Sequence, residues 1–123
     1  MELTAVKNLS SGGGLKVDYG IATATISTVY SPQPLFTIQD APILLILCEH
    51  AAGLGGAFYR LLPNSSNLEE AQKPWNKLNV NYGYFTDSSS NVQGNLYRVG
   101  NTVYYTESGF TGKEITVHYA LIS

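Results

Sequence analysis

Three side chains of this 123-residue chain are best suited to nucleophilic chemistry: the two histidines, His50 and His118, and the single cysteine, Cys48. Such chemistry needs a serine or cysteine, a histidine base and an acid held together. No G-x-S-x-G segment, which would place a serine on a sharp turn, occurs in the sequence. Cys48 ends the most apolar stretch, 43–48, where a buried and inert thiol is expected. The sequence therefore predicts no catalytic residue.

Metal and phosphate sites also lack their usual spacing. Glu49 and His50 form one adjacent pair, and no second pair stands at ligand spacing. The glycines of 12–14 and 53–56 match neither the phosphate loop nor the dinucleotide fingerprint. The adjacent acids Glu69 and Glu70 suit the first turn of a helix better than a glycosidase pair. We therefore expect no metal, no cofactor and no enzymatic activity.

Charge and hydropathy restrict the partners. The net charge is −2 and the seven Lys and Arg residues are scattered, so nucleic-acid binding is not expected. No apolar run approaches the ~18 residues of a membrane span, and no basic amphipathic helix occurs. The first residues lack the charged and apolar regions of a signal peptide, so we expect synthesis in the cytoplasm.

The segments that would position any site are strand-like and separated by turn residues. They cover 21–29, 35–38, 43–48, 57–62, 78–85, 92–99, 102–106 and 114–122. Gly100-Asn101 between two of them suits a two-residue type II′ hairpin. In the last segment, Ile115, Val117, Tyr119 and Leu121 share one face. Strands recurring every ~8–12 residues predict an all-β fold, an antiparallel β-sandwich of jelly-roll-like type.

Three further features complete the predicted architecture. The uninterrupted apolar run 43–48 predicts a central strand covered on both faces, which requires two layers. Ser66 and Glu69 match a capping box and predict one short helix near 67–73, ended by Pro74. The glycines of 12–14 predict a hinge between an N-terminal strand or arm, 1–14, and the β-sandwich domain, 15–123.

Aromatic side chains are the remaining candidates for recognition. Trp75, Tyr82, Tyr84 and Tyr104 are the predicted ligand-binding residues, because tyrosine and tryptophan combine apolar area with a polar tip. Tyr104 and its neighbour Tyr105 must point to opposite faces of a strand. The alternative is that the tyrosines line the sandwich core with their hydroxyls at its edge.

From Tyr19 to its end, the chain resembles small β-sandwich modules of tailed-bacteriophage and prophage virion proteins, such as tail-fibre head and tail-tip domains. Three stretches carry the resemblance: the Thr/Ala/Ile segment 21–26 with its Pro-containing connection, the apolar segment 43–48 after Ala41-Pro42, and the closing 119–122. The chain lacks the aromatic-Lys-Pro step common before the apolar strand of tail-fibre modules, and Asp40-Ala41-Pro42 stands there instead. The resemblance transfers no functional residue.

The resemblance implies a virion protein, tail- or fibre-associated, that is structural or recognises the host. We expect a homo-oligomer, with a trimer favoured, that contacts other virion proteins and takes a cell-surface glycan as a further partner. Two alternatives stay open. One is a capsid decoration or head-fibre protein anchored by residues 1–9, and the other is a free-standing carbohydrate-binding module.

Overall fold

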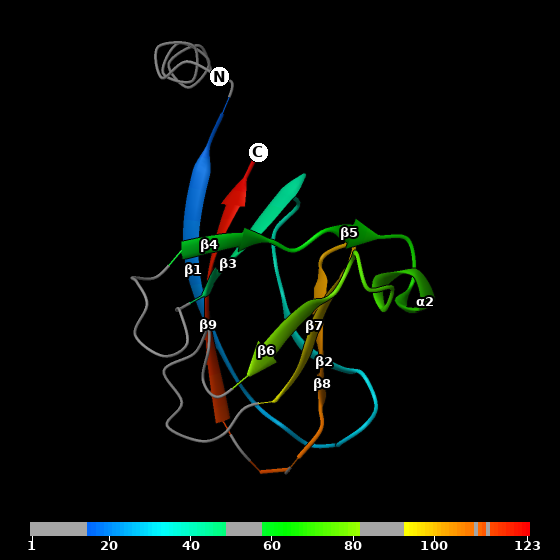
Figure 1. Cartoon of the computed structure of the whole chain (residues 1–123). Coiled ribbons are helices and arrows are strands. Elements are labelled where there is room, and N and C mark those ends of the chain that lie inside the picture. Colours follow the sequence, from blue (N-terminus) through cyan, green and yellow to red (C-terminus); the bar gives the residue numbers. More distant parts are fainter. Residues whose placement is uncertain (1–14, 49–57, 82–92, 110, 113) are drawn as a thin grey trace.

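The computed structural model describes residues 15–48, 58–81, 93–109, 111–112 and 114–123. Its strands form two sheets that face each other (Figure 1). Sheet A has the order β1 (Val17–Thr25), β9 (Glu114–Ile122), β3 (Ile43–Cys48), β4 (Phe58–Leu61). Sheet B has the order β2 (Gln33–Thr37), β8 (Thr102–Glu107), β7 (Gln93–Val99), β5 (Asn64–Ser65), and β6 (Leu78–Asn81) also pairs with β7. Only the short β5–β7 pair is parallel among these described pairs.

Alternate residues of both sheets meet in one core between the layers. Sheet A contributes Leu44, Ile46 and Cys48 from β3 and Ile115, Val117 and Leu121 from β9, and sheet B contributes Leu96, Val103 and Tyr105. Strands β3 and β8 bury every second side chain, because successive side chains of a strand point to opposite faces. The prediction of an all-β sandwich is confirmed, and the last strand has the predicted bounds and inward-facing set.

The first strand of the described chain differs from its predicted bounds. The sequence pattern placed it at 21–29, but β1 starts at Val17 and ends at Thr25. Its whole length pairs with β9, from Val17 opposite Ile122 to Thr25 opposite Glu114. The partner strand therefore sets the bounds, and it extends β1 across Asp18 and Gly20. The predicted N-terminal arm, the hinge and the ends of the segments 57–62, 78–85 and 92–99 lie outside the described residues.

Strand β3 is covered on one face only, which corrects the prediction of burial on both faces. Leu44 and Ile46 are fully buried against sheet B. On the opposite face, Ile43 is exposed, and Leu45 and Leu47 are only half-buried. A two-layer sandwich supplies one covering layer for each sheet, so a strand that is apolar on both faces leaves one apolar face open.

The only helix of the described chain is shorter than predicted and begins one residue later. Helix α2 (Leu68–Ala71) follows the N-cap Asn67, whose side-chain oxygen accepts a hydrogen bond of 2.9 Å from the Glu70 N–H. Ser66 is therefore not the cap, and the helix does not reach residue 73. Asparagine at this position satisfies a free N–H as well as serine does.

Two local predictions hold. Gly100, in the two-residue turn between β7 and β8, has φ 61°, and Asn101 is not among the residues with positive φ. Those signs are the ones that a type II′ turn requires. Cys48 is fully buried, as expected.

The buried Cys48 thiol leads to a prediction on reactivity. Burial raises its pKa from the ordinary value of 9.0 to about 11, and the opposing influence of Arg60 is smaller. The thiolate is the reactive form, so at pH 8 the folded protein should react with a disulfide reagent at least ~100-fold more slowly than the urea-unfolded chain. Because the folded pKa lies above the unfolded one, this group stabilises the fold below about pH 9, and that contribution is lost as the pH rises through about 11. Absorbance-monitored labelling at several pH values measures the reactivity, and urea unfolding at the same pH values measures the stability. Equal labelling rates for the folded and the unfolded chain would contradict the prediction.

Candidate functional site

The outer face of sheet A is the most apolar exposed surface of the described chain. The registers place Val17, Tyr19, Ile21, Thr23, Thr25, Ile43, Leu45, Leu47, Tyr59, Leu61, Glu114, Thr116, His118, Ala120 and Ile122 on it. Six of the eight large apolar side chains that are exposed in the described residues lie on this face. Glu114, at one end, is the only acidic residue of this set, and the set contains no lysine or arginine.

Two tyrosines form a shallow trough on this outer face. Tyr19 of β1 and Tyr59 of β4 lie with their ring centroids 6.0 Å apart and their planes at 52°. The trough has a volume of about 560 Å³, and Ile21 and His118 also line it. The two rings meet above β9 and β3, the strands that separate β1 from β4. Tyr19 lies opposite Ala120 of β9, whose small side chain leaves room for the ring, and Tyr59 lies opposite Leu47 of β3. The trough is aromatic and open, which suits the packing of an apolar partner surface.

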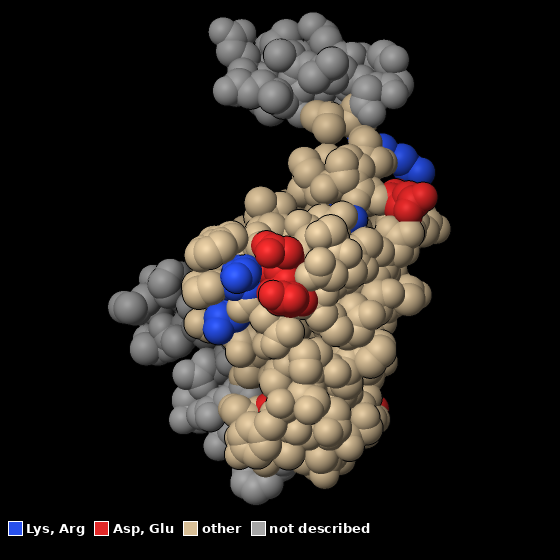
Figure 2. Space-filling view, turned by 90° about the vertical axis from the view of Figure 1, so that its right-hand side faces the viewer, with Lys and Arg blue, Asp and Glu red and all other residues tan. Residues whose placement is uncertain are grey.

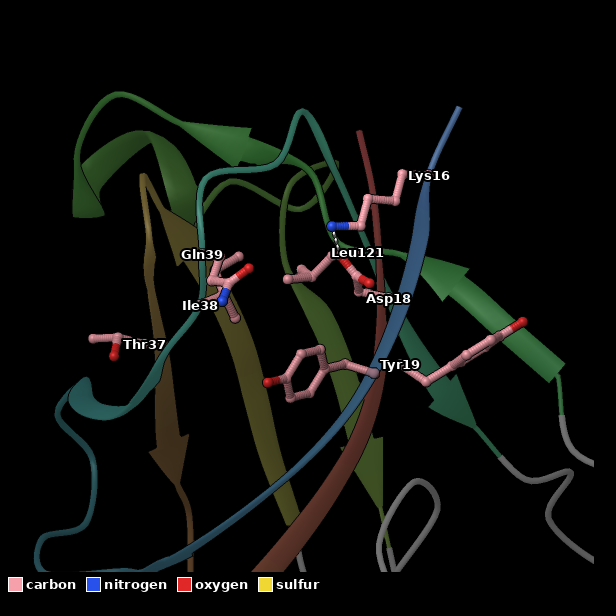
Figure 3. Close-up of a pocket in the computed structure, with 8 residues that line it drawn as sticks. Lys16, Asp18, Tyr19, Thr37, Ile38, Gln39 and Leu121 are labelled. Atoms are coloured by element: carbon pink, nitrogen blue, oxygen red, sulfur yellow. Dashed lines mark ion pairs between the residues drawn. The ribbon is translucent and has the colours of Figure 1, made fainter. Parts of the chain in front are cut away.

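A second hollow opens between the two sheets at the start of β1. It has a volume of about 580 Å³ and is lined by Lys16, Asp18, Tyr19, Thr37, Ile38, Gln39, Tyr119 and Leu121. Lys16 and Asp18 point toward each other, and Ile38 and Gln39 face them from the segment after β2, whereas Tyr19 points away (Figure 3). The Lys16 Nζ and Asp18 Oδ2 atoms are 3.5 Å apart and exposed, so this ion pair contributes little to stability. The cleft offers hydrogen-bonding groups around an apolar floor, which suits binding.

The side of the molecule that carries α2 differs from the outer face of sheet A. Acidic and basic side chains gather there near α2 and again at the upper edge (Figure 2). The acids Glu69 and Glu70 lie in the first turn of α2. Charged groups at these places keep this side solvated, so the apolar outer face of sheet A is the stronger candidate for a contact surface.

The predicted ligand-binding residues do not form one site in the described chain. Trp75 follows α2 and is 71% exposed, as expected for a recognition residue. Tyr104 lies half-buried on β8, and Tyr105 beside it is fully buried in the core, so the prediction of opposite faces is confirmed. Neither Trp75 nor Tyr104 belongs to a ring pair among the described residues. Tyr82 and Tyr84 lie outside the described residues.

Sequence reasoning missed the two tyrosines that do come together, Tyr19 and Tyr59. A signal was present, because Val17, Tyr19 and Ile21 alternate with Asp18 and Gly20. This alternation is the pattern of a strand with one apolar face.

Comparison with protein-family models, with curated proteins and with solved structures finds no match to this chain. No group of three or more His, Cys, Asp or Glu side chains that could hold a metal ion occurs among the described residues. In the same part of the chain, no helix is long and apolar enough to cross a membrane.

Proposed function

We propose that this protein is a non-enzymatic structural module of a tailed-bacteriophage or prophage virion, tail- or fibre-associated, that works as a homo-oligomer and contributes to recognition of the host surface. The observation that carries the self-assembly in this proposal is the apolar outer face of sheet A. Monomeric proteins rarely leave a contiguous apolar surface of this kind exposed, and large exposed patches mark interaction sites. The resemblance to virion modules supplies the context.

The character of the face favours a second copy of the chain over a charged or nucleic-acid partner. The exposed residues that dominate it are aliphatic or aromatic, including Tyr19 at 73% and Leu61 at 55% exposure. Strand β3 is apolar on both faces, as a strand in the middle of a three-layer packing would be. Such a sequence is explained if the third layer comes from another copy in the assembled particle. The trimer that the resemblance implies is the first stoichiometry to test.

The test is the molar mass of the purified protein by size-exclusion chromatography with light scattering. We expect an oligomer for the wild type and a smaller mass for Leu61→Glu, because this change places an unpaired charge in the apolar contact. The dissociation constant should rise by at least ~100-fold. Leu61 is more than half exposed on the edge strand β4, so the fold should tolerate the change.

The matched control is Trp75→Glu, which places the same charge at a side chain of similar exposure away from sheet A. This variant should keep the wild-type mass. A wild-type monomer at millimolar concentration, or equal effects of the two glutamates, would overturn the proposal. Analysis of gradient-purified particles for this protein tests the virion context independently.

A further inference from the structure

Strand β1 is an open edge of sheet A, and its length and regularity set it apart from the other edges of the described chain. Its nine residues pair with β9 without any shift of register. The other edges are short or interrupted: β4 and β6 have four residues each, β5 has two, and β2 has five with Pro34 and a register shift. Short strands, prolines, bulges and charged side chains are the devices that keep sheet edges from pairing with other chains. Strand β1 carries only one of them, Asp18 near its start, whose carboxylate is paired with Lys16.

The backbone groups that face this open edge can be identified. The Lys16 N–H donates to the Ser123 carbonyl and the Ser123 N–H donates to the Lys16 carbonyl, so these two residues form a hydrogen-bonded pair with the β9 side. Hydrogen-bonded and non-hydrogen-bonded pairs alternate along an antiparallel ladder. The N–H and C=O groups of Val17, Tyr19, Ile21, Thr23 and Thr25 therefore point away from β9.

The end of the strand agrees with this assignment. Gln33 donates from Nε2 to the Thr25 carbonyl at 3.4 Å, which is consistent with a carbonyl that points away from β9. Thr25 is thus covered, and Val17, Tyr19, Ile21 and Thr23 present the open part of the edge.

We infer that the open edge of β1 pairs antiparallel with β1 of a second copy, so that sheet A continues across a two-fold axis. This inference rests on the proposed function in assuming that copies of the chain associate, and it names one contact between them. A two-fold seam gives an even number of copies: a dimer by itself, or a hexamer when it joins two trimers, and either assembly would lose half of its mass without the seam. A register centred on Gly20 uses every open residue: Val17 lies opposite Thr23 of the second copy, and Tyr19 lies opposite its Ile21. Each of these residues then donates one hydrogen bond and accepts one.

Side chains and charges favour this occupant. The residues whose backbone groups point away from β9 also place their side chains on the outer face of sheet A. The pairing therefore brings Tyr19, 73% exposed, against Ile21, 66% exposed, across the seam. Aromatic and β-branched residues are favourable cross-strand neighbours. The antiparallel direction separates the Lys16–Asp18 pair of one copy from that of the other, whereas a parallel seam would set Asp18 beside Asp18.

The decisive variant is Thr23→Pro, compared with Thr23→Val. Proline removes an outward N–H and blocks the edge without removing a β1–β9 hydrogen bond. Valine also removes the hydroxyl but keeps the N–H. We expect Thr23→Pro to halve the molar mass of the assembly and Thr23→Val to leave it unchanged, with both variants folded by circular dichroism.

Amide hydrogen exchange gives a second readout on the unmodified protein. The amides of Val17, Tyr19, Ile21 and Thr23 should be protected in the assembly and lose at least ~100-fold of that protection on dilution to the monomer. If Thr23→Pro changes neither the mass of the oligomer nor the protection of the edge amides, the seam is overturned and the proposed function stands. If the wild type is a monomer, both are overturned. If removal of residues 1–13 is needed before the copies associate, the edge is covered within one chain and the seam is also overturned.

Discussion

Replacing Gly94 with alanine is expected to lower the free energy of unfolding by about 3 kcal/mol or more, the largest loss that we predict for a single methyl group. A Cβ atom at this position of β7 would lie 1.8 Å from the carbonyl oxygen of Thr106 and 2.9 Å from the Tyr105 hydroxyl. The carbonyl belongs to the backbone of β8, which pairs with β7 along six residues. Because neither strand can move without breaking this ladder, the added methyl group separates the two central strands of sheet B.

The matched control is Gly20→Ala on β1. Its Cβ would lie 2.3 Å from the Tyr119 ring, but the contact is with the far end of a side chain that can turn aside. We expect this change to cost about 1 kcal/mol, mainly through the disturbed stacking of Tyr119 on Phe36, whose centroids are 5.3 Å apart. Urea unfolding followed by tryptophan fluorescence compares the two variants, and a Gly94→Ala midpoint equal to that of Gly20→Ala would contradict the prediction.

Local patterns in the sequence identified the fold class, because a strand with one buried face shows an alternation of apolar and polar side chains within its own residues. The alternation from Ile115 to Leu121 predicted the inward-facing set of β9, and the Gly100-Asn101 pair predicted the turn before β8. The sequence pattern did not predict strand bounds that depend on a partner strand. Strand β1 extends back to Val17 because β9 continues to Ile122 beside it.

The surface that carries the proposed function could not be read from the sequence for a physical reason. An apolar strand such as β3 has the same pattern whether its second face is covered by its own chain or by another one. The pairing of Tyr19 with Tyr59 likewise depends on the strand order β1-β9-β3-β4, which puts these tyrosines on the two edge strands of one sheet. Strand order is set by packing between distant segments, so aromatic content alone directed attention to Trp75 and Tyr104 instead.

Glu107, at the end of β8, is the buried acid on which the second large prediction rests. Its side chain is fully buried, and no lysine or arginine of the described residues forms an ion pair with it. Hydrogen bonds hold the carboxylate instead: Oε1 accepts from the Tyr105 hydroxyl at 2.8 Å, and Oε2 accepts from the Gly109 N–H at 2.9 Å. The carbonyl of Glu107 also accepts from the Tyr30 N–H at 2.8 Å, so this residue joins the strand to two loops.

Changing Glu107 to leucine should destabilise the fold by about 3 kcal/mol, because it leaves the buried Tyr105 hydroxyl without an acceptor and also removes the acceptor of the more exposed Gly109 N–H. Glu107→Gln should cost less, about 1 kcal/mol, since the amide oxygen can still accept from Gly109 while the Tyr105 hydroxyl rotates to accept from the amide nitrogen. The double variant Glu107→Leu with Tyr105→Phe should be less destabilised than the sum of the single variants, because one of the orphaned donors is removed. Additive losses in urea unfolding would show that the hydrogen bond contributes nothing.

The same pair should limit stability in alkali. Burial, followed by the hydrogen bond to Glu107, raises the pKa of the Tyr105 hydroxyl above its ordinary value of 10.0. A raised folded pKa means that the contribution is complete below about pH 10 and is lost as the unfolded chain releases its proton at higher pH. We expect the wild type to lose stability between pH 10 and 11 more steeply than Tyr105→Phe, which has no proton to release at this site. If the stability of the two proteins falls in parallel with pH, the alkaline loss of stability comes from another group. Because Cys48 titrates in the same range, the comparison is best made in a Cys48→Ala background.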